Sequence, residues 1–355
     1  MVNGELSEPS DVLSGVPQGT VLGPILFLML INDIDKDIVN KVSLFADDTR
    51  LTGEVDTEND VEALQADLNK IYAWQTENNM LFNGKKFEML RFGKNDDLKS
   101  NTVYFSPGYE DIIEVKESLR DLGVIMSDSS NFKDHINKVC TTVKQKFAWI
   151  LRTFKSRDTN FMKLMWKSLV QGHIDYCSQL YMPIQSTEMM QLENLQKCFT
   201  KRIPEVQSLD YWQRLKYLRI YSQNRRLERY RIIYTWKILE NLVPNCGLEF
   251  SVSERRGRCV NVPTLKGSKR IQNLREQSFQ VHGPKLFNCL PHTIRNITRV
   301  SVEDFKEKLD QYLSTIPDEP NVDGLTPGTC DLYTAKPSNS IIDQSRGIRI
   351  RKPGN

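Results

Sequence analysis

The sequence predicts an α+β protein, in which short strands and helices mix in the first part of the chain and helices dominate the rest. Before residue 126, short apolar segments are separated by turn dipeptides such as Asn83-Gly84 and Pro107-Gly108, as between strands. After residue 126, apolar residues recur at helical spacing, as in Ile136, Val139 and Val143. A chain of 355 residues, 26% of them charged, has the length of about two domains and the composition of a globular protein.

The first expected elements are a helix and a hairpin, both within residues 1–95. Residues 21–31 are apolar throughout and predict a short helix. Residues 42–46 predict a largely buried strand, and residues 49–52 its returning partner. The bend between them falls at Asp47-Asp48, so two adjacent carboxylates are expected at the end of the hairpin.

A second helix and two further strands complete this region. Thr57 and Asp60 have the spacing of a capping box, which predicts that a helix begins there. Apolar residues continue at helical spacing as far as Asn78-Asn79, where the helix is expected to end. Beyond it, strands are predicted at 80–82 and 87–92, on either side of a tight turn.

The remaining chain is predicted to be helical and to end in a disordered tail. Further helices are expected near 158–171, 187–201, 222–242 and 302–314. From Pro317 onward, Pro, Gly, Ser, Asp and Asn replace apolar residues, a composition that builds no core. The expected divisions are therefore residues 1–95, a connection that leads into helices at 96–155, a basic helical region at 156–315, and the tail at 316–355.

Composition excludes several functional classes. The longest apolar run, 21–31, is too short for a membrane span, which takes about 20 residues. No Lys or Arg precedes Lys36, so the basic start of a secretory signal is absent. The 7 cysteines form no C-x-x-C or C-x-C pair, which argues against zinc and redox motifs and indicates reduced thiols in an intracellular protein, nuclear or cytoplasmic. A net charge of +3 does not by itself indicate an acidic partner.

Two short segments combine residues that can carry chemistry. Residues 14–27 read Ser-Gly-Val-Pro-Gln-Gly-Thr-Val-Leu-Gly-Pro-Ile-Leu-Phe, a glycine- and proline-shaped loop before an apolar helix, whose N–H groups suit a phosphate or a base edge. Residues 44–49 read Leu-Phe-Ala-Asp-Asp-Thr, and two adjacent carboxylates on a tight turn suit Mg²⁺. Taken alone, the first is more often an ordinary loop and the second a solvated turn.

Together, and in this order, the two segments resemble the reverse transcriptases of non-LTR (LINE-type) retrotransposons, of the jockey and chicken-repeat kind. Residues 14–27 match that family's S-G-x-P-Q-G-x-x-L-G-P-x-L-F block, and residues 45–48 match its F-A-D-D block. The resemblance covers residues 10–315 and continues through Trp74, Asn78, Met80, Phe82-Asn83, Lys86, Phe92-Gly93, Leu122-Gly123-Val124, His135-Ile136, Leu286-Phe287-Asn288, Leu290-Pro291 and Phe305-Lys306.

The resemblance implies a partial polymerase palm followed by a mostly helical thumb. It also implies an RNA-directed DNA polymerase, which acts on an RNA template, a DNA primer and dNTPs with two Mg²⁺ ions, or Mn²⁺ in their place, and without a membrane. Asp47 and Asp48 would hold the metal, with Asp47 as the more direct ligand because neighbouring strand residues point to opposite faces. Lys86 matches a lysine near the triphosphate that can act as an acid, and an ordinary surface lysine is the equal alternative.

Four further residues are assigned by the same resemblance. Pro17, Gln18 and Gly19 match the loop that packs beside the incoming nucleotide and the template base. Phe45 precedes the two aspartates in the metal-binding block and is grouped with the nucleotide- and template-binding residues.

The resemblance also predicts an incomplete site. The family's palm needs another aspartate on a strand upstream of the first block, but only 13 residues precede Ser14, and a parallel crossover alone takes a dozen or more. Asp11 lies too close to the loop to supply that carboxylate, and Asp33 follows the helix. The chain is therefore expected to be the later part of a longer polymerase, without its N-terminal palm, fingers and endonuclease, and to be inactive alone. The missing strand would leave apolar surface and a strand edge uncovered.

A basic stretch adds a possible nucleic-acid surface. Residues 211–237 hold eight Lys or Arg residues against Glu228, with seven aromatic residues between them. Cations that follow a phosphate backbone and rings that stack on bases are typical of single-strand binding, and the candidates are Arg225, Arg226, Arg229 and Arg231. The alternative is a helix with core aromatics and a solvated basic face.

Two other interpretations of function stay open beside the polymerase fragment. One is a non-catalytic RNA- or DNA-binding module derived from a retroelement. The other is a non-functional pseudogene product without a stable fold, against which a cooperative unfolding transition would count.

Overall fold

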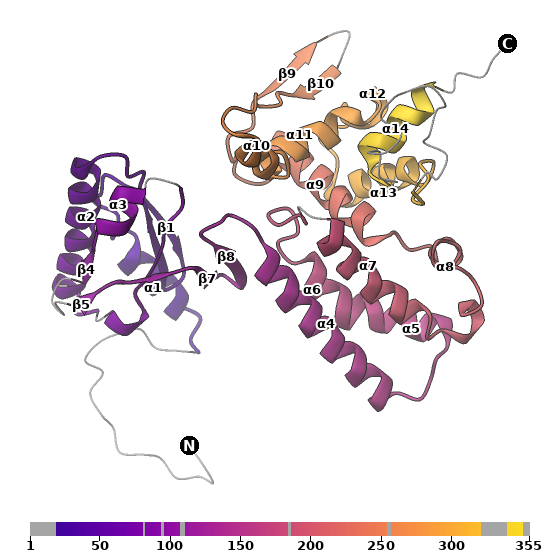
Figure 1. Ribbon diagram of the computed structural model, residues 1–355, viewed down its shortest axis with the longest axis horizontal. Helices are drawn as coiled ribbons and strands as arrows, with labels where there is room; N and C mark the ends of the chain where they lie inside the picture. Colours follow the sequence, from indigo (N-terminus) through magenta and orange to yellow (C-terminus); the bar gives the residue numbers. More distant parts are fainter. Residues whose placement is uncertain are drawn as a thin grey trace. The chain divides into compact units, whose positions relative to one another are not determined.

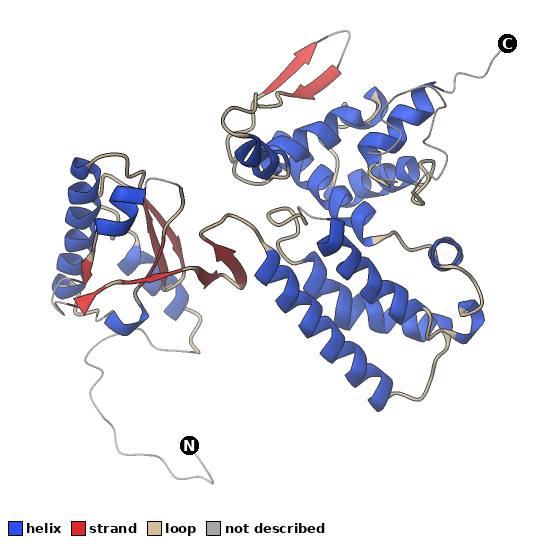
Figure 2. Ribbon diagram, in the orientation of Figure 1, coloured by secondary structure: helices blue, strands red, loops and turns tan. Residues whose placement is uncertain are grey.

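A computed structural model describes residues 19–80, 82–93, 96–106, 111–183, 186–253, 257–320 and 339–350. The chain divides into two compact units, of which residues 1–119 with 127–129 form the first and residues 120–126 with 130–355 the second. Helices and small sheets mix in the first unit, whereas helices dominate the second (Figures 1 and 2). This composition agrees with the α+β prediction. No helix in the described ranges combines the length and the apolar character that crossing a membrane requires.

The first unit is built from short elements beside one long helix, α2. Its elements in chain order are α1 (Gly23–Ile31), β1 (Lys41–Phe45), β2 (Asp48–Thr52), α2 (Glu58–Glu77), the 3₁₀ turn η1 (Gly84–Lys86), β3 (Glu88–Leu90), α3 (Asp96–Asn101), β4 (Phe105–Ser106), β5 (Asp111–Ile112), β6 (Glu114–Lys116) and β7 (Ser118–Asp121). β7 pairs with β8 (Val124–Ser127), and the chain enters the second unit in this hairpin.

The strands pair two by two. β1 and β2 form an antiparallel hairpin, and β4 and β5 another, whereas β3 pairs with β6 in parallel. Of the two strands predicted at 80–82 and 87–92, the second is present as β3, but it pairs with β6 and not with residues 80–82. After α2 the chain forms η1 instead, and the Phe82 ring turns inward and stacks on Trp74, with the ring centroids 6.5 Å apart. Leu81 lies outside the described residues.

A small core joins α1 to α2. Ile31, Ile34, Ile71 and Trp74 are buried together, and α2 begins at the predicted capping box, in which the side chain of Thr57 accepts from the backbone N–H of Asp60. The Trp74 indole donates a hydrogen bond of 2.8 Å to Asp33 Oδ1. Trp74 and Phe82, which belong to the motif residues of the resemblance, thus contribute to this core.

The second unit is a stack of helices with one added hairpin. After β8 its elements are α4 (Lys133–Thr153), α5 (Thr159–Met165), the π-helical η2 (Trp166–Gln171), α6 (Gly172–Asp175), α7 (Ser186–Thr200), η3 (Pro204–Val206), α8 (Tyr211–Leu218), α9 (Gln223–Leu239), β9 (Phe250–Ser253), β10 (Gly257–Val260), α10 (Lys269–Glu276), α11 (Phe279–Cys289), α12 (His292–Arg295), α13 (Val302–Leu313) and α14 (Ile341–Ile350).

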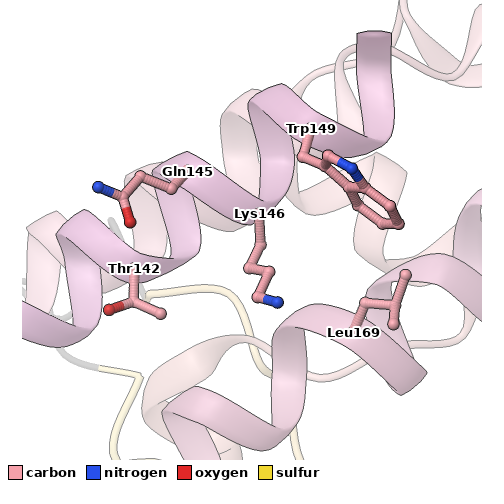
Figure 3. Close-up of a pocket in the computed structure, with 5 residues that line it drawn as sticks. All are labelled: Thr142, Gln145, Lys146, Trp149 and Leu169. Carbon is pink, nitrogen blue, oxygen red and sulfur yellow. The ribbon is translucent and has the colours of Figure 1, made fainter. Parts of the chain in front are cut away.

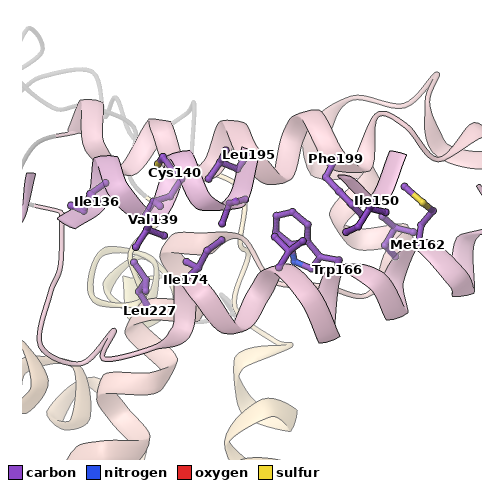
Figure 4. Close-up of a cluster of buried hydrophobic side chains, with 14 of the residues drawn as sticks. Ile136, Val139, Cys140, Ile150, Met162, Trp166, Ile174, Leu195, Phe199 and Leu227 are labelled. Carbon is purple, nitrogen blue, oxygen red and sulfur yellow. The ribbon is translucent and has the colours of Figure 1, made fainter. Parts of the chain in front are cut away.

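Two apolar clusters hold this unit together, and α9 takes part in both. The predicted stripe of α4 packs with residues of α5, η2 and α7 in the first cluster (Figure 4), which Leu227 of α9 joins. The second cluster gathers α9, α11, α13 and α14, and in it the rings of Trp236 and Phe305 stack with centroids 4.3 Å apart. Leu286 and Phe287, from the late motif segment, are fully buried there.

Packing contacts extend across two of the predicted divisions. Because α4 shares one core with α5 and α7, the division expected at residue 155 falls inside a packed unit. The tail expected at 316–355 is packed in part, since Ile341 is fully buried and its backbone N–H donates to Glu228 over 2.7 Å. Composition averages over a segment, whereas a few apolar residues next to a buried carboxylate suffice to dock one helix. Residues 321–338 and 351–355 lie outside the described part.

Candidate functional site

The adjacent aspartates lie at the end of the β1–β2 hairpin, as the sequence predicts. Phe45 pairs with Asp48, so Ala46 and Asp47 form a two-residue turn between the strands. Ala46 has a positive φ of 53°, a conformation that glycine adopts more readily and that tight hairpin turns require. Asp47 thus lies in the turn itself and Asp48 in the ladder, so the strand alternation expected for this pair does not apply.

The hairpin has one face toward the core and one toward solvent. Val42 and Leu51 face each other across the ladder and are half-buried, and Leu51 packs against the small core. Because side chains alternate along a strand, Phe45 and Asp48 share the opposite face. The Phe45 side chain is 65% exposed, which is unusual for an aromatic residue. The turn therefore presents two carboxylates and one aromatic ring to solvent.

Asp67, on α2, anchors the chain that leads into β1. Its fully buried carboxylate accepts hydrogen bonds from the backbone N–H groups of Val39 and Asn40, at 3.1 and 2.8 Å, and from the Asn40 side chain at 2.9 Å. Lys70 Nζ lies 2.9 Å away. Although burial alone would raise the pKa of Asp67, these donors lower it. Sequence analysis missed this residue, and its signal was a carboxylate on the apolar stripe of a helix.

The other predicted site residues are not brought to the aspartates by any described contact. Gly19 is exposed, with a φ of 79° that favours glycine, while Pro17 and Gln18 lie outside the described residues. Lys86 ends the 3₁₀ turn after α2 and is exposed, and no ion pair links it to the hairpin in the described part of the chain. Its assignment stays a prediction.

The hairpin fits a divalent cation only in part. Mg²⁺ in enzymes is commonly held by one or two carboxylates together with water and substrate phosphates, and Asp47 with Asp48 supplies such a pair. Within the described ranges, no group of three or more His, Cys, Asp or Glu residues gathers as a metal-ligand set. A site for two ions would therefore need ligands from outside these residues.

Helix α1 exposes a large apolar surface in the same unit. Its inner side packs through Phe27 and Ile31, while its outer side chains and the two residues before it, although apolar, are 44–89% exposed: Val21, Leu22, Ile25, Leu26, Leu28 and Met29. A helix that is apolar on all sides normally lies inside a core. This surface therefore lacks a partner among the described residues.

The Leu122-Gly123-Val124 motif contains the turn of the hairpin that leads into the second unit. Leu122 and Gly123 both adopt positive φ values, 44° and 87°, as the two-residue turn between β7 and β8 requires. A Cβ at Gly123 would lie 3.4 Å from the Tyr176 ring, whose hydroxyl donates to the Leu122 carbonyl over 2.7 Å. The positive φ of Gly123 favours glycine at this position, whereas a Cβ there would make only an ordinary contact with the Tyr176 ring.

The prediction that Arg225 contacts nucleic acid is wrong. Its side chain is fully buried, and its guanidinium donates to the carbonyls of Ile316 at 3.2 Å and Pro317 at 2.6 Å. Asp318 lies 3.8 Å from its Nε. This cation therefore donates to carbonyls of the segment that follows α13, inside the second unit.

The other three arginines are also engaged inside the second unit. Arg231 is fully buried and donates to the Gln277 carbonyl over 2.7 Å, and burial lowers its pKa to about 10. Arg226 forms a two-pronged pair with Asp175 on α6, with a shortest N–O distance of 2.6 Å. Arg229 does the same with Asp310 on α13, at 2.5 and 2.7 Å. The core alternative is favoured for this stretch, because Arg225 and Arg231 are buried and Arg226 and Arg229 are paired with carboxylates. The assignment of Arg226 and Arg229 to nucleic acid stays a prediction.

Comparison with known proteins identifies the class of the first region. Residues 1–149, which include the Asp47–Asp48 hairpin, match the family described as "Reverse transcriptase (RNA-dependent DNA polymerase)". No solved structure matches the chain.

Two curated relatives from Drosophila melanogaster are RNA-directed DNA polymerases of mobile elements, a more specific class. The chain is 25% identical over 187 residues to the "Probable RNA-directed DNA polymerase from transposon X-element", a match that covers 50% of this chain and 20% of the relative. It is 23% identical over 219 residues to the "RNA-directed DNA polymerase from mobile element jockey", covering 57% and 23%. The resemblance to the reverse transcriptases of non-LTR retrotransposons is therefore confirmed. The matches span less than a quarter of the length of either relative.

Proposed function

We propose that this chain supplies the carboxylate hairpin of an RNA-directed DNA polymerase, which extends a DNA primer on an RNA template with dNTPs. The observation that carries the proposal is the β1–β2 turn, where Asp47 and Asp48 stand in solvent within a segment that matches the reverse transcriptase family. Two contacts stabilise the position of this turn. Val42 and Leu51 are half-buried, and Asp67 accepts hydrogen bonds from the residues before β1.

The roles of the chain's residues follow from their chemistry. Mg²⁺, or Mn²⁺, when bound, supplies the positive charge that favours attack by a primer hydroxyl and stabilises the departing pyrophosphate. Asp47 and Asp48 would hold such an ion together with the phosphates of the nucleotide. Phe45 shares the face of Asp48 and offers a ring against which a base or sugar can pack. Lys86 is the candidate donor toward the leaving group, and its side chain is exposed after α2.

We further propose that the chain acts together with a polymerase segment that covers α1. Its exposed apolar side chains, together with a hairpin that has no third strand among the described residues, form a surface that a further palm segment would cover. That segment would also supply the additional carboxylate for a second ion. The chain alone is then expected to be inactive in synthesis.

Metal binding tests the proposed role of the hairpin without requiring activity. We expect Mn²⁺ to bind the chain weakly in the presence of a dNTP. Its electron paramagnetic resonance signal measures this binding. Binding should fall at least tenfold in Asp47→Asn, whereas Glu54→Gln, an exposed acidic control just beyond β2, should bind as the native chain does. Equal Mn²⁺ binding by the native chain and Asp47→Asn would overturn the proposal.

Primer extension tests the proposed incompleteness. A purified chain with RNA template, DNA primer, dNTPs and Mg²⁺ is expected to give no extended product. Extension that Asp47→Asn abolishes would show that the site is complete without a further segment.

A specific observation favours a second function, non-catalytic binding of nucleic acid. Helix α4 carries lysines and an exposed tryptophan that are remote in sequence from the hairpin. Binding that persists in Asp47→Asn would support it. The third alternative, a product without a stable fold, predicts no cooperative unfolding, which a urea titration of the chain would reveal.

A further inference from the structure

Residues 339–350, here called the C-terminal strap, are held on the second unit by little apolar surface. The strap ends in α14, which packs on α11 (Figure 1). Among the described side chains of α14, Ile341 is the one apolar residue that is fully buried, whereas α13 buries Phe305, Leu309 and Leu313 completely. Hydrogen bonds must therefore carry much of the docking of the strap.

Glu228 of α9 holds the first turn of α14. Its side chain is buried, and its two oxygens accept hydrogen bonds from Ser340 Oγ at 2.6 Å and from the backbone N–H of Ile341 at 2.7 Å. The first N–H groups of a helix have no partner within that helix, and here a carboxyl group of another helix supplies one. The start of α14 therefore depends on one residue of α9.

Asn339 anchors the strap at a second point. Its side chain accepts from Asn224 Nδ2 at 2.9 Å and donates to Ser222 Oγ at 3.1 Å. Ser222 in turn donates to Asp318 through its hydroxyl and its backbone N–H, each at 2.7 Å. The strap, α9 and the segment after α13 thus share one hydrogen-bonded cluster around the buried Arg225.

The charge of Glu228 is set by its surroundings. Burial raises its pKa to about 7 and Asp343 of α14 adds to the rise, whereas the two strap donors and Arg225 oppose it. Arg231, on the same helix, also interacts with Glu228. The neighbouring elements α7, α8, α11 and the segment after α13 add the titratable groups Glu193, Tyr211, His282, Lys285 and Asp318.

We propose that residues 339–350 form a releasable strap, and that the protonation state of Glu228 governs whether the strap is docked. In the docked strap a neutral carboxyl group can donate to Ser340 Oγ while it accepts from the N–H of Ile341, so both contacts survive protonation. When the strap leaves, water reaches Glu228, which then gives its proton to solvent. A rise in pH therefore favours release, which uncovers the apolar cluster against which Ile341 packs.

An identified occupant distinguishes this surface from the groove beside α4. That groove is an open space of about 340 Å³ between α4 and η2, and Figure 3 shows Lys146 extending into it and Trp149 directed toward Leu169. The surface of α9, in contrast, is filled by residues 339–341 of the same chain. The strap proposal is also independent of whether the chain catalyses synthesis.

Hydrogen exchange of the full chain, followed by mass spectrometry from about pH 5 to about pH 8, measures release. Rates are divided by the intrinsic exchange rate at each pH to give protection factors. We expect the protection of α14 amides to fall by about tenfold per pH unit up to about pH 7, and then to level off. It should also be at least tenfold lower than that of α9 amides at every pH, because the strap opens without unfolding the unit.

Glu228→Gln tests the role of the carboxyl group. The amide copies its neutral form, since the oxygen can accept from the N–H of Ile341 and the nitrogen can donate to Ser340 Oγ. The protection of α14 in this variant should stay constant across the pH range. Ser340→Ala, a change on the strap itself, keeps the test available if Glu228→Gln does not fold. It should lower α14 protection about fivefold at pH 5, in line with the loss of one hydrogen bond.

Glu193→Gln is the matched control. Burial also raises the pKa of Glu193 to about 7, but its oxygens accept from Tyr211 and from the backbone N–H of Asn224. The pH dependence of α14 protection in this variant should follow that of the native chain.

Four results would overturn the inference. These are α14 protection that does not change with pH in the native chain, an unchanged pH dependence in Glu228→Gln, native protection of α14 in Ser340→Ala, or α14 amides as well protected as those of α9 at every pH. The last result would mean that the strap opens only when the whole unit unfolds. Asp47→Asn should match the native chain in these measurements, so failure of the hairpin proposal and failure of this one give different results.

Discussion

Arg225→Ala is the substitution that separates the structure's account of α9 from the basic-surface interpretation. The Arg225 guanidinium donates to the carbonyls of Leu313, Ile316 and Pro317, at 3.4, 3.2 and 2.6 Å, and lies 3.8 Å from Asp318. Truncation removes the Arg225 donors of the Ile316 and Pro317 carbonyls, while Leu313 keeps the backbone N–H of Ile316, and it leaves a buried cavity where the long side chain packed. If the arginine instead contacted nucleic acid, the variant would fold normally and bind less.

The magnitude follows from the burial of the group. Removing one partner from a buried charged network costs about 3–5 kcal/mol, because the remaining polar groups lose compensation. This is a large fraction of the roughly 5–15 kcal/mol by which a domain is stable. Loss of Arg225 would affect Asp318 in particular, because burial raises the pKa of Asp318 and the charge of Arg225 opposes that rise.

Urea unfolding of the full chain, combined with hydrogen exchange of α9 and α13, measures this effect. In Arg225→Ala, we expect the free energy of hydrogen exchange to fall for amides of both helices. This fall should equal the loss in the free energy of global unfolding of the second unit. Lys216→Ala, an exposed change on the neighbouring helix α8, should shift stability by less than about 0.5 kcal/mol. A variant as stable as the native chain, but with weaker binding of single strands, would refute the reasoning.

Three further predictions concern other parts of the chain. Asp67→Asn should destabilise the first unit by about 2–3 kcal/mol, because an amide cannot accept all of the hydrogen bonds from residues 39–40. Hydrogen exchange of β1 would detect this loss. Because the pKa of Asp67 is lowered on folding, its stabilisation is present above pH 4 and is lost as the pH falls further. Burial raises the pKa of Glu228 to about 7, so ionisation of this group destabilises the second unit as pH rises from about 4.5 to about 7, and urea titrations should show a flatter pH profile in Glu228→Gln. Met29→Lys should leave unfolding unchanged, because the side chain is 72% exposed, and should reduce self-association measured by sedimentation; a loss of stability would show that this face of α1 is packed.

Local sequence patterns were sufficient for much of the first unit. The capping box at Thr57 and Asp60 specified where α2 begins, because it involves residues three apart in the chain. A bend of the chain close to Asp47 and Asp48 was predictable for the same reason, since the alternation of β1 and the turn that follows are local properties, although the turn itself is Ala46–Asp47. The parallel pairing of β3 with β6 was not, because it joins strands 26 residues apart whose short apolar stretches carry no register signal.

The sequence by itself determined the resemblance to reverse transcriptases of non-LTR retrotransposons, the hairpin with its two aspartates and the positions of most helices, since motifs and helical periodicity are contained in neighbouring residues. Only the tertiary structure decided which positive charges are free. Two stretches, 133–171 and 211–237, carry the same excess of cations over carboxylates, yet α4 exposes its lysines while α9 buries or pairs its arginines. The reason is that α9 packs between two apolar clusters, and a buried guanidinium must find carbonyls or carboxylates there, whereas α4 packs on one side only.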